Sequence, residues 1–516
     1  MKTSSAFLWQ LIRSMTANEK LFFKRNFALN GYGSKPLYLK LFDAIAAQKK
    51  YNEEAILKKF SPELTKKNIA FQKHYLQQQV SEAIAQYDNR NSTGHDIYNQ
   101  ILLIRVYRKK GLLDEAHALW KKAVVKARGT ESYAKLNLLK TEFEKMILFS
   151  SVHTSYDDLH SVFKGNIITY TEYAEMITLR DIYTEVLLLK RKAHFDLDDE
   201  LKQRINLLLE RVNATNTIPN RRSFWFRHYF GMSKATLLYL LQDIATAFAL
   251  LKDAWQDWRE NQNFIGTDGE FYIEVLYMIN YAGILRGDYS YVQNTFNDQV
   301  NELITDPVQR ANFEVIKFLA FNKIYNKTAK YDEVEKLNRF MKSRYQQWEP
   351  VLNADLNRTT NLSLGIGSFV LEQYDEALYY IKRGITYFKE GVREEHEAVA
   401  QILLLLTCYC MNNPKLFDAQ YRATYNYFYK RKKKQPFETA LVQCLHRTFY
   451  MKEIKGRVNE YRKTLAVFEA NRDNVVQQLN LAIFNYYGWL ESRAQRIGYR
   501  QYVVERKVKR DSLSPT

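Results

Sequence analysis

Cysteine, proline and glycine are all scarce in this chain of 516 residues, which has only 3, 8 and 18 of them, respectively. Tight turns in all-β proteins draw heavily on proline and glycine, so these numbers argue against an all-β fold. The cysteines, Cys408, Cys410 and Cys444, form an odd and sparse set. Such a set argues against a disulfide scaffold and fits a reducing compartment.

The sequence also lacks a long apolar run. The longest, residues 402–411, has the length of a buried helix segment and not that of a membrane span. Near the start, the apolar residues 6–12 are interrupted by Gln10 and closed by Arg13. This stretch is too short and too polar for the core of a signal peptide, so we expect a cytoplasmic protein that does not enter a membrane.

The sequence motifs of common enzyme chemistries are missing too. The sequence contains no phosphate-binding G-x-x-x-x-G-K-[ST] loop, no H-E-x-x-H and no G-x-S-x-G. The nearest approach to a metal site is the group His153, Asp157, Asp158 and His160. It falls where a turn between two repeated helices is expected. We therefore predict no catalytic residue, no metal and no cofactor, and hence no enzyme.

Positive charge is present in excess, and it gathers at the two ends. The formal net charge is +19. Residues 1–90 hold 15 Lys and Arg against 7 Asp and Glu, and residues 421–516 hold 20 against 8. The segment between them is close to neutral. The ends, and not the body, therefore have the charge that suits nucleic acid.

A periodic pattern runs through the middle of the chain. In YRKKGLLDEAHALWKKA, residues 107–123, the small residue Ala116 is followed by Trp120 and Ala123. Equivalent positions recur every 42 to 46 residues, at Ala116, Leu159, Leu201, Ala247, Val292, Val334, Ala377 and Ala419. A small side chain lets the two helices of a hairpin approach closely, and stacked hairpins bury their apolar faces together. The pattern predicts helical repeats.

These positions resemble the tetratricopeptide repeat, whose signature is a Leu-Gly pair, an aromatic residue, then Ala, an aromatic residue and Ala. Two units carry the resemblance: Leu364, Gly365, Ala377 and Gly384 in one, and Leu103, Tyr107, Ala116, Trp120 and Ala123 in the other. The family repeats at about 34 residues, whereas this chain repeats at about 43. The resemblance implies an all-α fold, a right-handed α-solenoid of stacked antiparallel helix hairpins.

Three regions are expected on this basis. Residues 1–90 form a basic N-terminal helical cap or a small helical domain. Residues 91–430 form the tetratricopeptide-like repeats. Residues 431–516 form a basic C-terminal helical segment with a short disordered tail.

The resemblance also implies that ligand contacts come from the first helix of each hairpin. Transferred to this chain, those positions are Arg105, Arg108, Tyr239, Tyr277, Tyr281, Lys323 and Asn326. They offer cations and aromatic rings, which suit an acidic or extended peptide. We therefore expect a non-enzymatic interaction scaffold that binds a peptide or protein partner on the concave face of the solenoid.

Two alternatives to this function stay open. The first is binding to nucleic acid or the ribosome through the basic ends, with the run Lys430, Arg431, Lys432, Lys433 and Lys434 as candidate anion contacts beside several tyrosines. The second is a regulator whose N-terminal helices act as the effector while the solenoid senses a peptide. The sequence does not indicate an oligomeric state.

Overall fold

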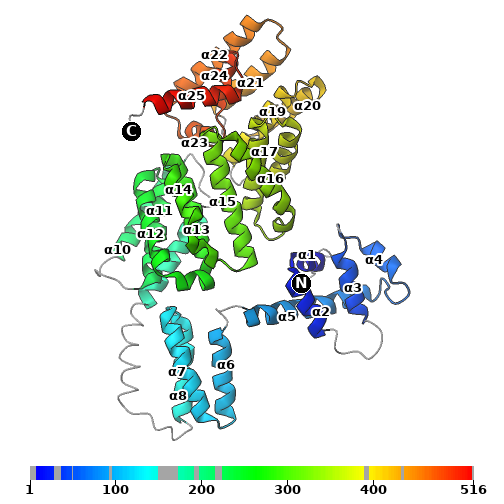
Figure 1. Cartoon of the computed structure of the whole chain (residues 1–516), viewed down its shortest axis with the longest axis vertical. Helices are drawn as coiled ribbons and strands as arrows, with labels where there is room; N and C mark the ends of the chain where they lie inside the picture. Colours follow the sequence, from blue (N-terminus) through cyan, green and yellow to red (C-terminus); the bar gives the residue numbers. More distant parts are fainter. Residues whose placement is uncertain are drawn as a thin grey trace. The chain divides into compact units, whose positions relative to one another are not determined.

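A computed structural model describes residues 7–27, 36–48, 50–91, 96–148, 173–190, 197–215, 223–388, 394–431 and 435–513. Within these ranges every regular element is a helix and no strand occurs, which confirms the predicted all-α class. Contacts divide the chain into two compact units, residues 1–165 and 166–516. Figure 1 shows the helices of both units coloured along the sequence.

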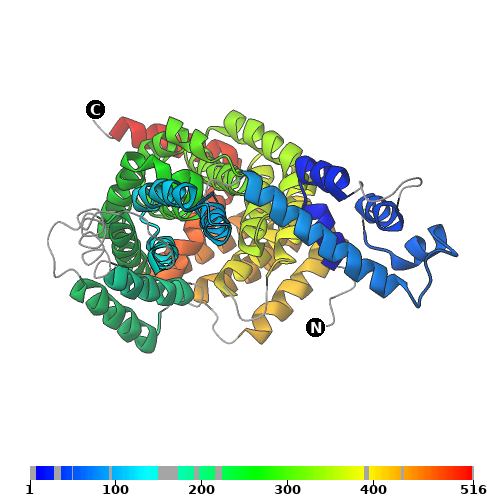
Figure 2. The same ribbon diagram turned by 90° about the horizontal axis from the view of Figure 1, so that it is seen from below.

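The first unit contains eight labelled helices among the residues described. They are α1 (Phe7–Ser14), α2 (Ala17–Phe27), α3 (Leu37–Ala46), α4 (Glu53–Lys59), α5 (Ile69–Asn91), α6 (Asp96–Lys109), α7 (Leu113–Gly129) and α8 (Tyr133–Leu148). Helices α1, α2 and α3 all pack against α5, the long helix of this unit in Figure 2. Their core centres on side chains such as Ile12, Phe42 and Leu76. Helices α6, α7 and α8 pack on one another around a separate cluster that includes Trp120.

The first helix that the structure describes in the second unit spans residues 173–190. The helices that follow are α10 (Asp199–Ala214), α11 (Phe224–Leu240), α12 (Ile244–Glu260), α13 (Ile265–Arg286), α14 (Tyr289–Asn297), α15 (Pro307–Lys327), α16 (Tyr331–Trp348), α17 (Ala354–Val370), α18 (Tyr374–Ile385), α19 (Glu394–Cys410), α20 (Pro414–Lys430), α21 (Pro436–Tyr450), α22 (Ile454–Ala470), α23 (Val475–Ile483), α24 (Tyr486–Ala494) and α25 (Tyr499–Leu513). Two 3₁₀ turns, η1 (Gln262–Phe264) and η2 (Gln299–Leu303), lie between them.

Consecutive helices of this unit pair as hairpins, and the hairpins stack. The pairs α11 with α12, α13 with α14, α15 with α16, α17 with α18 and α19 with α20 are each in contact. The first helices α11, α13, α15 and α17 also contact one another in succession. Each hairpin therefore buries its apolar face against the next, and the predicted α-solenoid of tetratricopeptide-like hairpins is confirmed.

The predicted small or apolar positions form the helix contacts. Ala116, Ala247, Val292, Val334 and Ala377 are all fully buried at the start of the second helix of their hairpins. Leu201 is only half-buried, on α10, and Leu159 lies outside the described residues. In five of the eight units, therefore, the sequence pattern located the point where the two helices meet.

Six hairpin turns within the described residues have a left-handed residue five positions before a buried contact residue. In successive turns these are Gly111, Gln242, Gly287, Ala329, Glu372 and Asn412, with φ between +53° and +82°. The turn residue Asn412 shows that the prediction of Ala419 as the helix-contact position of its hairpin is wrong, because the residue five positions after Asn412 is Phe417. Phe417 is fully buried, whereas Ala419 is exposed. A large ring replaces the small side chain in this hairpin.

The C-terminal helices pack on the repeats and share their core. Tyr486 donates a hydrogen bond from its hydroxyl to the backbone oxygen of Val399 in α19, at 2.8 Å. The rings of Phe484 and Phe369 meet edge to face at 5.3 Å. The region boundaries expected near residues 90 and 430 stay predictions. Among the helices described, none is both long enough and apolar enough to cross a membrane.

Candidate functional site

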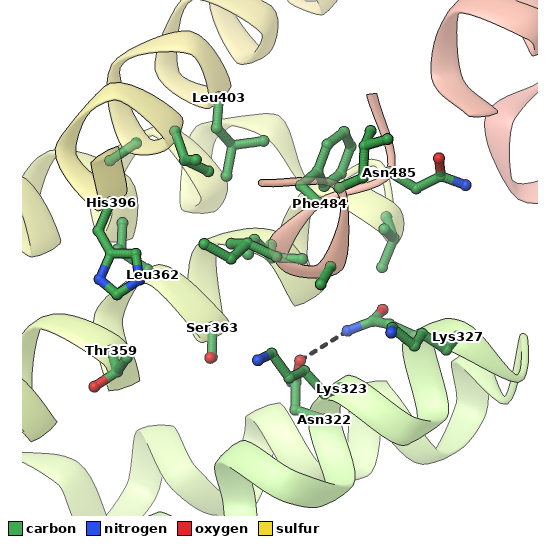
Figure 3. Close-up of a pocket in the computed structure, with 18 of the residues that line it drawn as sticks. Asn322, Lys323, Lys327, Thr359, Leu362, Ser363, His396, Leu403, Phe484 and Asn485 are labelled. Carbon is green, nitrogen blue, oxygen red and sulfur yellow. Dashed lines mark hydrogen bonds between the residues drawn. The ribbon is translucent and has the colours of Figure 1, made fainter. Parts of the chain in front are cut away.

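A pocket of about 340 Å³ lies in the second unit, where α15, α17 and α19 meet the C-terminal helices. Ligand pockets in proteins range upward from about 300 Å³, so this one suits a side chain or a small molecule. Figure 3 shows its two sides, with Lys323 and Lys327 of α15 opposite Leu403 of α19 and Phe484 after α23. Residues about 200 positions apart in the sequence therefore build a single cavity.

The cationic side of the pocket is formed by Lys323. Its Nζ lies 5.0 Å from the centre of the Tyr281 ring on α13, a cation–π contact. Within the described residues Lys323 has no carboxylate partner. Burial lowers the pKa of the Lys323 ammonium to about 8, with a smaller contribution from the positive charge of Lys327. A desolvated ammonium without a counter-ion is energetically costly, and groups of this kind gather at functional sites.

A chain of asparagines lies beside this lysine. Asn326 donates from Nδ2 to Oδ1 of Asn322 at 2.7 Å, as the dashed line in Figure 3 marks. Asn322 donates in turn to Oδ1 of Asn338 in α16 at 2.9 Å. Gly367 leaves room for that amide, because a Cβ there would lie only 2.5 Å from Nδ2 of Asn338. The Oδ1 of Asn326 is buried with no hydrogen-bond partner among the residues described.

The opposite walls of the pocket are apolar. Helix α17 contributes Leu362, Ile366 and Val370, and α19 contributes Val399 and Leu403. The C-terminal segment closes the cavity with a third set of side chains, which includes Leu481, Ile483, Phe484, Tyr499 and Val503. None of the residues that line the pocket in the described part of the chain is Asp or Glu.

Arg358 also lines the pocket, but its charge is used within the fold. Its guanidinium pairs with Asp355 on the same helix and lies 4.9 Å from the centre of the Phe388 ring. Asp355 accepts a further hydrogen bond from the hydroxyl of Tyr277, at 3.2 Å. The ring of Tyr277 lies tilted against that of Tyr281, with ring centres 4.8 Å apart. The pair of tyrosines predicted from the sequence thus lies beside the cavity, and Tyr281 lines it.

Two other predicted contacts, Arg105 and Arg108 of α6, lie in the first unit and meet a buried carboxylate. Arg105 approaches Oε1 of Glu142 on α8 to 2.8 Å, and Arg108 approaches Oε2 to 3.4 Å. The side chain of Glu142 is only 1% exposed. Burial alone would raise the pKa of Glu142, but the hydrogen bond from Arg105 and the nearby cations lower it. These arginines therefore join α6 to α8, and their role as ligand contacts stays a prediction.

The remaining predicted residues lie outside the pocket. Tyr239 is half-buried near the end of α11. Lys430 is exposed at the end of α20, and the buried Arg431 pairs with Glu438 of α21 at 2.9 Å. Lys432, Lys433 and Lys434 are outside the described residues, as is the group around His153. A contact of this basic run with nucleic acid stays a prediction.

Together, the stacked hairpins and the cavity between them define a helical-repeat protein with a mostly apolar pocket, in which Lys323 has no carboxylate partner among the described residues. No family model matches the sequence, and no curated protein matches it either. Among solved structures, a Rap protein in complex with competence and sporulation factor is similar, with a TM-score of 0.44 and 12% identity over 81% of this chain and 98% of that chain. The apo form of RapI gives a TM-score of 0.40 and 12% identity over 78% and 97%.

Replacing Lys323 with methionine should make the protein more stable, because the change removes a desolvated charge and keeps the aliphatic stem. We expect the Tm at pH 7 to rise by about 1–3 °C. The unfolded chain keeps this proton to about pH 10.5, whereas the folded one releases it near pH 8. The free energy of unfolding of the wild type therefore increases relative to that of the variant as pH rises through this window. The Tm difference between the two proteins should be smaller at pH 10 than at pH 7.

Melting curves at pH 7 and pH 10 check this expectation, with Lys336→Met as a control on the exposed face of α16. The Lys336 side chain is 68% exposed, so its replacement should leave the Tm nearly unchanged. The titratable or charged groups that line the pocket with Lys323 are Tyr281, Lys327, Tyr331, Arg358, His396 and Tyr499. All six are present in both proteins, so the comparison measures what Lys323 contributes, including its repulsion with Lys327. A lower Tm for Lys323→Met at pH 7 would contradict the expectation.

Proposed function

We propose that this chain is a non-enzymatic interaction scaffold that binds a peptide or protein partner on the concave face of its solenoid, with part of that partner inserted into the pocket. The observation that supports this most is the convergence of three predicted contact residues on one cavity. Tyr281, Lys323 and Asn326 were selected by their place in the first helices of their hairpins, and all three line the pocket. A mostly apolar cavity with a few polar groups is the usual form of a recognition site.

We also propose that the protein works in the cytoplasm. In the described residues, Cys408, Cys410 and Cys444 are all free thiols. Burial raises the pKa of each of these thiols to about 11. Thiols of this kind are inert structural groups, which suits a reducing environment.

The test is selection from a random peptide library, followed by a measurement of the selected peptides in solution. Fluorescence anisotropy would give Kd for wild type and for Ser363→Trp, which places a large ring in the cavity from α17. We expect Kd to rise at least about tenfold, because the ring occupies the space that the ligand requires.

Ser343→Trp provides a matched control, since Ser343 is exposed on α16 outside the pocket. This variant should bind the selected peptides as wild type does. The proposal fails if no peptide is selected, or if the selected peptides bind both variants equally well.

A further inference from the structure

We infer that helices α20 and α21 present a binding surface for single-stranded RNA, on which exposed tyrosine rings stack with unpaired bases and neighbouring cations contact phosphates. None of the residues that carry this inference lines the pocket. The surface is therefore independent of the proposed peptide binding. Only the choice of RNA over DNA rests on the proposed cytoplasmic location, because most single strands in that compartment are RNA.

The first observation is a row of aromatic rings along α20. Tyr421, Tyr425 and Tyr429 recur at every fourth residue, which places them on one side of the helix. The ring centres of Tyr421 and Tyr425 are 6.1 Å apart, and those of Tyr425 and Tyr429 are 6.5 Å apart. Tyr425 is 53% exposed and Tyr429 is 72% exposed. A row exposed to this extent offers ring faces to a ligand.

Helix α21 and the core hold one end of this row in place. The His446 ring of α21 stacks on that of Tyr421, with ring centres 3.9 Å apart and an interplanar angle of 15°. On the other side of Tyr421 lies the fully buried Phe417, with ring centres 6.3 Å apart. Rings that are fixed before binding lose little conformational entropy when a base stacks on them. The row is therefore anchored at Tyr421, and its exposed end lies at Tyr429.

The second observation concerns negative charge, which these two helices do not expose. They contain two carboxylates, Asp418 and Glu438. Asp418 accepts a hydrogen bond from the hydroxyl of Tyr450 at the end of α21. Glu438 is buried and paired with Arg431. An anionic ligand would therefore meet little repulsion from α20 and α21.

Positive charge, in contrast, is exposed on both helices. Four cations lie at exposed positions, namely Lys415, Arg422, Lys430 and Arg447. Arg422 lies three positions before Tyr425 and therefore on the same side of α20. Arg447 also pairs with Glu460 of α22, at 3.3 Å, so it contributes less than the other three. Rings interspersed with cations suit the bases and phosphates of a single strand.

The composition of this surface favours RNA over a protein partner. No Val, Leu, Ile or Met is exposed on the described helices α20 and α21. The centre of a protein interface usually contains desolvated apolar side chains and few lysines. A surface of tyrosine and cations lacks such a centre, whereas base stacking does not require one. A duplex is disfavoured too, because its bases are stacked on one another and do not offer their faces.

Fluorescence anisotropy on the full chain tests the inference with a labelled oligouridylate of about 20 nucleotides, which exceeds the length of a typical single-strand site. We expect binding at about 50 mM salt that weakens steeply towards 200 mM. Tyr425→Ala and Tyr429→Ala should each raise Kd about 5–150-fold, the usual effect of removing one stacking ring. Tyr429→Phe keeps the ring and should bind as wild type does.

The salt dependence separates the contribution of stacking from that of charge. Arg422→Ala should weaken binding and reduce the slope of log Kd against log salt concentration by about 0.7, the value for one phosphate contact on a single strand. Tyr429→Ala should leave that slope unchanged, because the ring carries no charge. A general defect of the fold would not divide the two variants in this way.

Tyr98→Ala is the matched control. Tyr98 in α6 is 44% exposed, and Nζ of Lys135 lies 5.0 Å from the centre of its ring, but this tyrosine belongs to the first unit. The control should bind the oligouridylate with the Kd of wild type. Far-ultraviolet circular dichroism verifies that each variant is folded.

Three results would overturn the inference. The first is no binding of the oligouridylate at low salt, which would leave the surface to a protein partner. The second is an unchanged Kd in both Tyr425→Ala and Tyr429→Ala. The third is tighter binding of an oligodeoxythymidylate or of an RNA duplex of the same length. Because the peptide experiment varies the pocket and this one varies α20, either proposal can fail without the other.

Discussion

Replacing Arg431 with alanine is expected to destabilise the second unit by about 3–5 kcal/mol, the usual cost of leaving one partner of a buried ion pair without the other. Both oxygens of Glu438 accept from Nη1 of Arg431, at 3.0 and 2.9 Å. The two side chains are only 5% and 0% exposed, respectively. Without the guanidinium, the Glu438 carboxylate would stay in the core and would lose both hydrogen bonds that Arg431 donates to it.

Glu438 also begins helix α21, which adds to the cost. Its Oε2 accepts from the backbone N–H of Gln435 at 3.2 Å, as one half of a capping box. The Arg431 side chain thus joins the segment after α20 to the first turn of α21. Loss of the arginine would disturb the cap as well as the charge balance, and caps contribute about 1 kcal/mol.

Chemical denaturation with a far-ultraviolet circular dichroism readout measures this effect, and Lys430→Ala is its matched control. Lys430 is adjacent in sequence but exposed, so its loss should change the free energy of unfolding by less than about 0.5 kcal/mol. The double variant Arg431→Met with Glu438→Gln should recover much of the stability, because it leaves no buried charge and keeps an amide for the cap. Equal effects of Arg431→Ala and Lys430→Ala would show that the buried pair contributes nothing.

The same two variants bear on the alternative function of the basic run. A surface cation that contacts phosphate should, when removed, weaken nucleic-acid binding uniformly and reduce its salt dependence. Lys430 is exposed and suits such a role, whereas Arg431 is committed to Glu438. The sequence alone does not distinguish the environments of Lys430 and Arg431, because a run of Lys and Arg has the same pattern whether its side chains face solvent or a buried carboxylate.

The fold was largely predictable because its signal is local. Ala116, Ala247 and Ala377 each lie five residues after a left-handed turn residue. Each repeat therefore carries the signal within its own turn and second helix, and the near-constant spacing shows that the units are equivalent. The error at Ala419 has a physical cause. The expectation that a small residue stands at the contact favoured the alanine, whereas the register of the turn at Asn412 places Phe417 there.

The lining of the pocket was only partly predictable, because part of it comes from C-terminal helices that lie far from the repeats in sequence. Tyr281, Lys323 and Asn326 were selected from their place in first helices, and all three line the pocket. Phe484 and Val503 were missed, since no periodicity indicates that the last helices return to α17 and α19. The ion pair of Arg105 with Glu142 was not predicted, because its partner lies 37 residues later and no local pattern indicates it.

Replacing Gly365 with alanine should destabilise the second unit by about 1–3 kcal/mol, although alanine normally stabilises a helix relative to glycine. A Cβ at Gly365 would lie 2.6 Å from Cγ1 of Ile381 and 3.2 Å from its backbone nitrogen, so α17 and α18 would have to separate. The identical change at Gly231, inside α11, meets no atom within 4 Å and should instead stabilise by about 0.5–1 kcal/mol. Urea denaturation of the two variants measures the contrast. Opposite signs would establish that close approach at this hairpin, and not helix propensity, selects glycine, whereas stabilisation by both would remove the physical basis of the repeat pattern.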